Sequence, residues 1–194
     1  MSRLQKVVVI FNGPPGSGKD EAAEYCTEMF DPAYHMMFKE KLFELVLSIF
    51  NISDEEFFEL YYNRETKNLP TCKLRGFSPR SAMIYVSETV IKPHFGKDYY
   101  GLCAAENMKG HGIYFFSDGG FKEEFKPVYD ECEGNMLIIR LHREGCNYSE
   151  DSRGYIHNFI DTTEVDVYND SSLEDFKVKV LAIIATYLEE LENA

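Results

Sequence analysis

Apolar residues along the chain alternate between short continuous runs, typical of buried strands, and the wider spacing typical of amphipathic helices. The predicted strands are residues 7–11, 33–38, 112–117, 135–141 and, by strict alternation, 164–168. The predicted helices are residues 20–30, 39–50, 54–63, 79–91, 98–110 and 173–191, with a shorter helical pattern, weakened by Pro127, between the third and fourth strands. Because strands separated by helices imply a parallel sheet, the pattern predicts an α/β fold of about five strands with helices on both faces.

Polar residues and prolines set the expected ends of several helices. Ser53 and Glu56 have the spacing of a capping box, which starts the third predicted helix. Ser78 is followed by a proline, a good start for the fourth, and Pro93 is expected to end that helix. Residues 39–50 carry apolar positions nearly all the way round, so this helix is expected to be mostly buried.

A loop rich in glycine and proline joins the first predicted strand to the first predicted helix. Such glycines let successive backbone N–H groups converge on phosphate oxygens, and the helix dipole points its positive end at the same place. The loop spacing and the lysine that follows fit the Walker A pattern G-x-x-x-x-G-K. The expected ATP contacts are Gly13, Pro14, Pro15, Gly16, Ser17, Gly18, Lys19 and Asp20.

Two aspartates are candidate magnesium ligands. Asp20 stands where the Walker A pattern has Ser or Thr, and its carboxylate can hold Mg²⁺ directly or through water. It also adds negative charge near phosphates, which Lys19 and the metal must offset. Asp118 follows an apolar strand, where a parallel sheet places residues that face a ligand. It is a candidate to bind Mg²⁺ through water or, in a site that transfers a phosphoryl group, to touch the molecule that accepts this group. An aspartate before two glycines also suits a plain turn.

The overall charge narrows the classes of partner. A formal net charge of −13 argues against a nucleic-acid surface, which needs a concentrated basic face, so Lys and Arg are expected where phosphates bind. No apolar run approaches membrane-spanning length and no signal region precedes the first strand, so we expect a cytoplasmic protein without membrane contact. Five cysteines without a C-x-x-C pair predict reduced thiols rather than disulfides or a zinc site.

Several segments resemble the bacteriophage-type deoxynucleoside monophosphate kinases, a branch of the P-loop nucleoside monophosphate kinases. In order, they are GPPGSGKD at 13–20, FKEKL at 38–42, RETKNLP at 64–70, GFSPRSAM at 76–83, KPHFGKDYY at 92–100, SDGGF at 117–121, RLHREG at 140–145 and VYNDSSL at 167–173. The Walker motif alone is neutral between families, whereas Lys-Asp in place of Lys-Ser/Thr, together with the S-P-R-x-A-M helix start, is more specific. The resemblance covers nearly the whole chain.

The resemblance implies one domain with a P-loop kinase fold, and the length of 194 residues also favours a single domain. The core would comprise residues 1–38, 110–141 and 159–194. An acceptor-binding helical insertion would span about 39–109, and a short lid about 142–158.

The resemblance also implies roles for individual residues. Arg143 and Arg153 look like lid arginines that act with Lys19 in catalysis, although Glu144 replaces the family's usual proline after the first of them. Asn169 would border the adenine of ATP. The implied contacts to the acceptor are Lys39, Arg64, Arg80 and Asp118, although Arg64 and Arg80 could also be ordinary solvated arginines.

The implied reaction transfers the γ-phosphoryl group of ATP, with Mg²⁺, to a deoxynucleoside 5′-monophosphate, in the host cytoplasm if the protein is phage-encoded. One alternative is a P-loop kinase for another phosphorylated small molecule, because Lys-Asp loops also occur in animal-type phosphomevalonate kinases. Another is a non-catalytic ATP-binding regulator, which would leave the basic residues 64, 75 and 80 unexplained. The sequence leaves open the accepted base, the choice between ribose and deoxyribose, and a homodimer.

Overall fold

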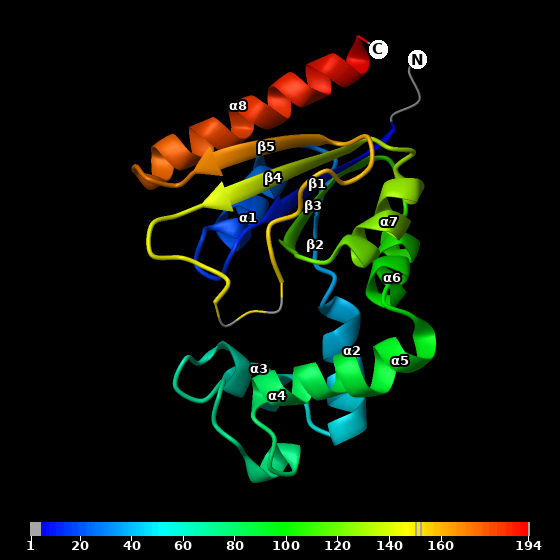
Figure 1. The fold of residues 1–194 in the computed structure, drawn as a ribbon, viewed down its shortest axis with the longest axis vertical. Coiled ribbons are helices and arrows are strands. Elements are labelled where there is room, and N and C mark those ends of the chain that lie inside the picture. Colours follow the sequence, from blue (N-terminus) through cyan, green and yellow to red (C-terminus); the bar gives the residue numbers. More distant parts are fainter. Residues whose placement is uncertain (1–4, 150, 152, 194) are drawn as a thin grey trace.

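A computed structural model describes residues 5–149, 151 and 153–193. Positions 1–4 and 194 of the predicted core, and 150 and 152 of the predicted lid, lie outside the described residues. The described chain forms one parallel sheet in the order β2-β3-β1-β4-β5 (Figure 1). The strands are β1 (Lys6–Asn12), β2 (Ala33–Met36), β3 (Gly112–Gly119), β4 (Met136–His142) and β5 (Thr163–Tyr168). The α/β prediction is confirmed.

Helices cover both faces of the sheet, as Figure 1 shows. Helices α1 (Lys19–Met29) and α8 (Leu173–Glu192) share one apolar cluster with alternate residues of the central strands. Helix α7 (Lys122–Glu131) belongs to the cluster on the opposite face. Since alternate residues of β1 enter opposite clusters, both faces of this strand are buried, and this explains its continuous apolar run.

The described chain between β2 and β3 consists of helices joined by loops and contains no strand. It forms a lobe beside the sheet (Figure 1). The helices are α2 (Glu40–Phe50), α3 (Asp54–Tyr62), α4 (Pro79–Ile84), a π-helical segment (Tyr85–Ile91), α5 (Lys92–Phe95) and α6 (Tyr99–Asn107), with a 3₁₀ turn at Cys72–Leu74.

The predicted helix starts are confirmed. The Ser53 hydroxyl accepts a hydrogen bond from the Glu56 amide at the start of α3. At the start of α4, Ser78 and Ser81 cap each other's backbone amides, at 3.1 and 2.8 Å. These bonds satisfy amides that have no partner within the helix.

The predicted helix end at Pro93 is wrong, because the chain stays helical through Phe95. Pro93 occupies the second position of α5, directly after the π-helical segment, where a missing N–H is tolerated. The helix ends instead at Gly96, whose φ of 98° is in the left-handed region that glycine adopts readily.

Helix α2 is less buried than its sequence predicts. Phe43, Val46 and Phe50 are buried, but Ile49 on the same helix is 46% exposed. Helix α2 packs against α4, the π-helical segment and α6, which cover one face only. Ile49 therefore meets solvent on the side of α2 that these helices leave open.

Candidate functional site

The glycine loop lies between the end of β1 and the start of α1, at the carboxyl edge of the sheet. Gly18 has a φ of 105°, and a Cβ built at this position would lie 2.9 Å from the Asn169 side-chain nitrogen. Helix α1 then begins at Lys19 without a side-chain cap. Its first amides therefore remain available to a ligand at the loop, as in an anion-binding site.

Lys19 lies within this loop rather than in solvent. It is 8% exposed, and its Nζ donates a 2.7 Å hydrogen bond to the Pro14 carbonyl. Burial, together with the nearby positive charge of Arg153, lowers the pKa of Lys19 to about 8. An anion beside this lysine would relieve both effects, so the arrangement favours a negatively charged ligand.

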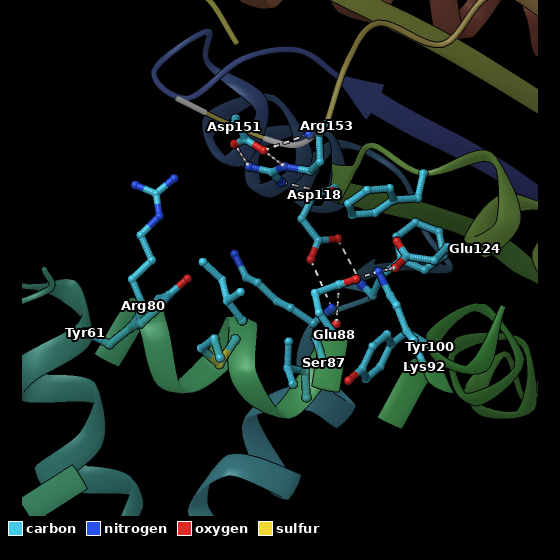
Figure 2. Close-up of a pocket in the computed structure, with 16 residues that line it drawn as sticks. Tyr61, Arg80, Ser87, Glu88, Lys92, Tyr100, Asp118, Glu124, Asp151 and Arg153 are labelled. Atoms are coloured by element: carbon cyan, nitrogen blue, oxygen red, sulfur yellow. Dashed lines mark hydrogen bonds and ion pairs between the residues drawn. The ribbon is translucent and has the colours of Figure 1, made fainter. Parts of the chain in front are cut away.

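A cavity of about 550 Å³ separates the helical lobe from the edge of the sheet. Figure 2 shows Arg80 and Tyr61 toward one end, Asp151 and Arg153 above, and Lys92, Tyr100 and Glu124 at the other end. Asp118 lies between them. The remaining lining residues are Phe38, Lys39, Leu42, Met83, Ile84, Ser87, Glu88 and Phe121.

Cations gather at the Arg80 end of this cavity. Burial lowers the pKa of Lys67, and the positive charges of Lys39, Arg80 and Arg153 lower it further. The Lys67 ammonium lies 4.0 Å from the centre of the Tyr61 ring. Such mutual repulsion on a protein of net charge −13 is offset when an anion binds among the cations.

Asp118 joins the end of β3 to the segment that enters α2. It is 8% exposed, and its carboxylate oxygens accept hydrogen bonds from the amides of Phe38 (2.9 Å) and Lys39 (3.0 Å). The carboxylate therefore sets the position from which Lys39 reaches into the cavity. Its predicted roles toward metal and acceptor stay predictions.

The two predicted lid arginines lie near the glycine loop. Arg153 lines the cavity and forms a two-pronged pair with Asp151, at 2.9 and 2.6 Å. Hydrogen bonding to Asp151 raises the pKa of Arg153, so this guanidinium stays charged. Arg143 is exposed and donates a 3.2 Å hydrogen bond to the Gly16 carbonyl.

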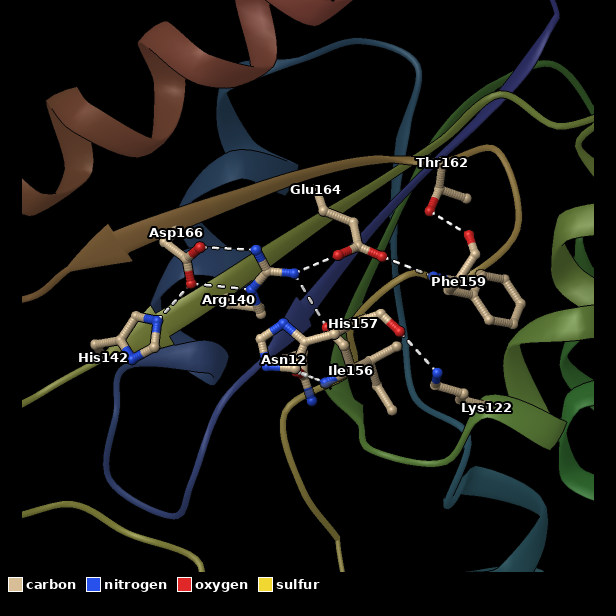
Figure 3. A network of polar contacts seen from close by, with 10 residues as sticks. All are labelled: Asn12, Lys122, Arg140, His142, Ile156, His157, Phe159, Thr162, Glu164 and Asp166. Atoms are coloured by element: carbon tan, nitrogen blue, oxygen red, sulfur yellow. Dashed lines mark hydrogen bonds and ion pairs between the residues drawn. The ribbon is translucent and has the colours of Figure 1, made fainter.

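A polar network fixes the returning half of the lid segment on the sheet (Figure 3). Arg140 of β4 is 7% exposed and donates to both carboxylate oxygens of Asp166 on β5, at 2.9 and 2.7 Å. It also pairs with Glu164 and donates to the Ile156 carbonyl at 3.1 Å. The Asn12 side chain accepts from the Ile156 amide at 2.8 Å. Arg140 is thus a buried structural cation.

Other predicted site residues lie in different surroundings. Arg64 is exposed and is not among the residues that line the cavity. Asn169 donates a 3.1 Å hydrogen bond to the Ser17 carbonyl, which places it against the glycine loop. Asp20 is exposed on the first turn of α1. Their predicted roles toward ligands stay predictions.

Sequence reasoning missed several residues that line or flank the cavity. Lys67 and Lys92 lie within segments already singled out, and the scarcity of basic residues on an acidic chain was a usable signal for both. Glu124 gave no such signal, because an acidic residue on a helix is common.

The residues present fit a magnesium ion held mainly by phosphates. Among the described residues, no group of three or more His, Cys, Asp or Glu side chains is placed to hold a metal. Mg²⁺ in phosphoryl-transfer sites usually takes only one or two carboxylates and completes its shell with water and phosphate oxygens. Asp20 and Asp118 suit that chemistry.

The comparisons with known proteins find similarity to solved structures. No family model and no curated protein matches the sequence. A crystal structure described as a "putative kinase" from Chloroflexus aurantiacus J-10-fl matches with a TM-score of 0.43 and 14% identity, over 99% of each chain. In the described part of the chain, no helix has both the length and the apolar character needed to cross a bilayer. The strand order and the glycine loop after β1 are those of a P-loop kinase-like fold.

Proposed function

We propose that this protein is a kinase that transfers the γ-phosphoryl group of ATP to a deoxynucleoside 5′-monophosphate, giving ADP and the diphosphate. One observation carries the proposal: Lys39 and Arg153, which line the cavity together with Arg80, also act electrostatically on Lys19 of the glycine loop, and they do so on an otherwise acidic protein. Phosphoryl transfer mainly requires that the phosphates be held in position and that positive charge lie near them, and this site has groups suited to both tasks.

ATP would bind at the glycine loop. The amides of the loop and of the first turn of α1 would hold the β- and γ-phosphates, and Lys19 would move from the Pro14 carbonyl onto them. Arg143 and Arg153 would add positive charge from the lid and exclude water. When bound, Mg²⁺ neutralises phosphate charge, and Asp20 and Asp118 are the residues that would hold it.

The acceptor would place its 5′-phosphate among Lys39, Lys67 and Arg80. An arginine fork matches a monophosphate through two parallel hydrogen bonds. An oxygen of this monophosphate forms the new P–O bond to the γ-phosphorus as the bond to the ADP oxygen breaks. The attacking oxygen is already anionic, so no residue needs to act as a strong general base.

The other end of the cavity favours a nucleoside over a phosphorylated carboxylic acid. Lys92 lies there, but its ammonium is 2.8 Å from a Glu88 oxygen and 3.9 Å from a Glu124 oxygen. No net positive charge remains for a second anionic group such as the carboxylate of phosphomevalonate. The rings of Phe38 and Phe121 also line the cavity and suit a flat base.

A coupled assay of ADP release tests the proposal. The wild-type protein would receive ATP, Mg²⁺ and, separately, the four deoxynucleotides, the four ribonucleotides and phosphomevalonate. We expect acceptor-dependent ADP release with at least one deoxynucleoside monophosphate. If ADP were released only with phosphomevalonate, the deoxynucleotide would be the wrong class of acceptor. If ATP were hydrolysed at the same rate with and without every acceptor, the protein would not be a kinase for these compounds.

A further inference from the structure

Two buried polar side chains point into the cavity at the end away from the cations (Figure 2). Tyr100, from α6, is 2% exposed, and among the described residues its hydroxyl has no well-aligned hydrogen-bond partner, although the Ser87 side chain lies close enough to act on it. Glu124, from α7, is 5% exposed. Buried polar groups without partners are rare in proteins, so the Tyr100 hydroxyl indicates a place for a polar group of a ligand.

The Glu124 carboxyl makes few polar contacts with the described residues. Its one ion pair in the described structure is with Lys92, at 3.9 Å, and this lysine lies closer to Glu88. The charges of Asp118, Arg153 and Glu88 also act on it. Burial raises the pKa of Glu124 to about 8, so at neutral pH the carboxyl is mostly protonated and offers one hydrogen-bond donor and one acceptor.

Close packing of two helices fixes these side chains beside each other. A Cβ built on Gly101 of α6 would lie 2.2 Å from the Glu124 carbonyl oxygen of α7. Only glycine therefore allows α7 to lie this close to α6. Tyr100 and Glu124 come from these two closely packed helices, and both line the same cavity.

We infer that Glu124, Tyr100 and Lys92 recognise the hydrogen-bonding edge of the acceptor's base. The inference rests on the proposed function, because the cations at the opposite end set where the phosphate binds. A base edge carries donors and acceptors side by side, which complements a protonated carboxyl, a phenol and an ammonium. Phe121 lies under Lys92, with 4.2 Å between the ammonium and the ring centre, and supports this end of the cavity.

We expect the protein to discriminate among bases, because a wrong base would leave hydrogen-bonding groups of the protein without partners. A site built to hydrogen-bond its substrate rejects an analogue that lacks the matching groups far better than an apolar pocket does. The three residues act through substrate binding, so their removal should raise KM for the acceptor rather than lower kcat.

The test compares Glu124→Ala, Glu124→Gln and Tyr100→Phe with Glu123→Ala, a matched control on an exposed neighbour of the same helix. Kinetic constants would be measured for the four deoxynucleoside monophosphates, and calorimetry would measure their equilibrium binding. We expect Glu124→Ala to raise KM and the dissociation constant of the preferred acceptor about 10- to 100-fold, and to narrow the preference among bases. KM for ATP should stay within about twofold of its wild-type value.

The conservative variant separates recognition from a structural role. Glutamine keeps one donor and one acceptor, so Glu124→Gln should retain most of the acceptor affinity and lose its pH dependence. In the wild type, acceptor KM should rise above about pH 8 as the carboxyl ionises and loses its donor proton. Tyr100→Phe should raise the same KM about 5- to 10-fold.

Two results would overturn the inference, and they differ. If the wild type phosphorylates a deoxynucleotide but folded Glu124→Ala matches Glu123→Ala in acceptor KM and base preference, recognition by this cluster is wrong and the proposed function stands. If the wild type shows no acceptor-dependent ADP release with any deoxynucleotide, the proposed function fails and the inference falls with it.

Discussion

The side-chain amide of Asn169 donates a 3.1 Å hydrogen bond to the main-chain carbonyl of Ser17. This bond ties the turn between β5 and α8 to the glycine loop, although the two segments are far apart in the sequence. The contact holds the glycine loop in shape, so we expect Asn169 to influence ATP binding through the loop.

Replacing Asn169 with alanine should weaken ATP binding. Loss of one hydrogen bond costs about 1 kcal/mol, which corresponds to about a fivefold rise in KM for ATP. The acceptor KM should change little. Asp170→Ala, at an exposed neighbour paired with Lys179, serves as the control. Equal ATP affinity in both variants would contradict a loop-positioning role.

Replacing Lys19 with alanine should abolish turnover. The lysine charge on the transferring phosphates is needed most in the transition state, so we expect kcat to fall by about a thousandfold or more. Circular dichroism and thermal unfolding would check that the fold persists. Lys179→Ala, which removes an exposed ion pair, should leave kcat unchanged. Unchanged rates in Lys19→Ala would contradict the mechanism.

Replacing Arg80 with alanine should chiefly weaken acceptor binding. We expect acceptor KM to rise about 10- to 100-fold, because charge-assisted hydrogen bonds to phosphate are stronger than neutral ones, while KM for ATP changes little. Arg64→Ala provides the comparison, since Arg64 is exposed and outside the cavity lining. An equal effect of the two variants would show that Arg64 reaches the acceptor after all.

Replacing Glu124 with glutamine should change how stability depends on pH. The pKa of Glu124 is raised by burial from 4.5 to about 8, so the folded protein keeps a proton that the unfolded chain releases. This group therefore lowers wild-type stability progressively as pH rises from 4.5 toward 8.

The glutamine side chain has no proton that titrates in this pH range, so this contribution to the pH dependence of stability is absent from the variant. The free energy of unfolding of Glu124→Gln, relative to wild type, should thus increase by about 2 to 4 kcal/mol between pH 5 and pH 8. Urea unfolding at several pH values measures it. Parallel stability curves for the two proteins would mean that Glu124 titrates normally.

Replacing Arg140 with alanine should destabilise the whole protein. The change leaves Glu164 and Asp166 without their buried cation and the Ile156 carbonyl without its donor. Removing one partner of a buried pair costs about 3 kcal/mol in the free energy of unfolding. Lys126→Ala, which breaks the exposed pair with Asp130, should cost less than about 0.5 kcal/mol. Similar losses would contradict a special role for Arg140.

The sheet could be predicted from sequence because each strand has a local signature. β1 reads as a continuous apolar run since both of its faces are buried, and the glycines after it announce a tight loop. The ends of the helical lobe were harder. Whether Pro93 ends a helix depends on the wider π-helical turn before it, and the burial of α2 depends on which helices pack against it. Neither is encoded locally.

In the candidate site too, residues of a local sequence motif could be predicted, whereas residues brought together by the fold could not. The glycine loop and Lys19 follow a contiguous pattern with a fixed chemistry, so sequence alone located them. Lys67, Tyr100 and Glu124 come from separate elements of the fold. Tyr100 and Glu124 line one cavity, and Lys67 lies within electrostatic reach of Arg80 at its other end, only because the helical lobe lies over the edge of the sheet. A residue whose role depends on such tertiary proximity carries no mark in a single sequence.

Gly101 has a consequence for how this protein could acquire a different acceptor. With no side chain between α6 and the main chain of α7, neither helix can move closer, and any larger residue would force the two apart. The width of the cavity at this end is therefore not freely adjustable. A change of preference would have to come from exchanging the side chains at positions 92, 100 and 124, on a backbone that stays where it is.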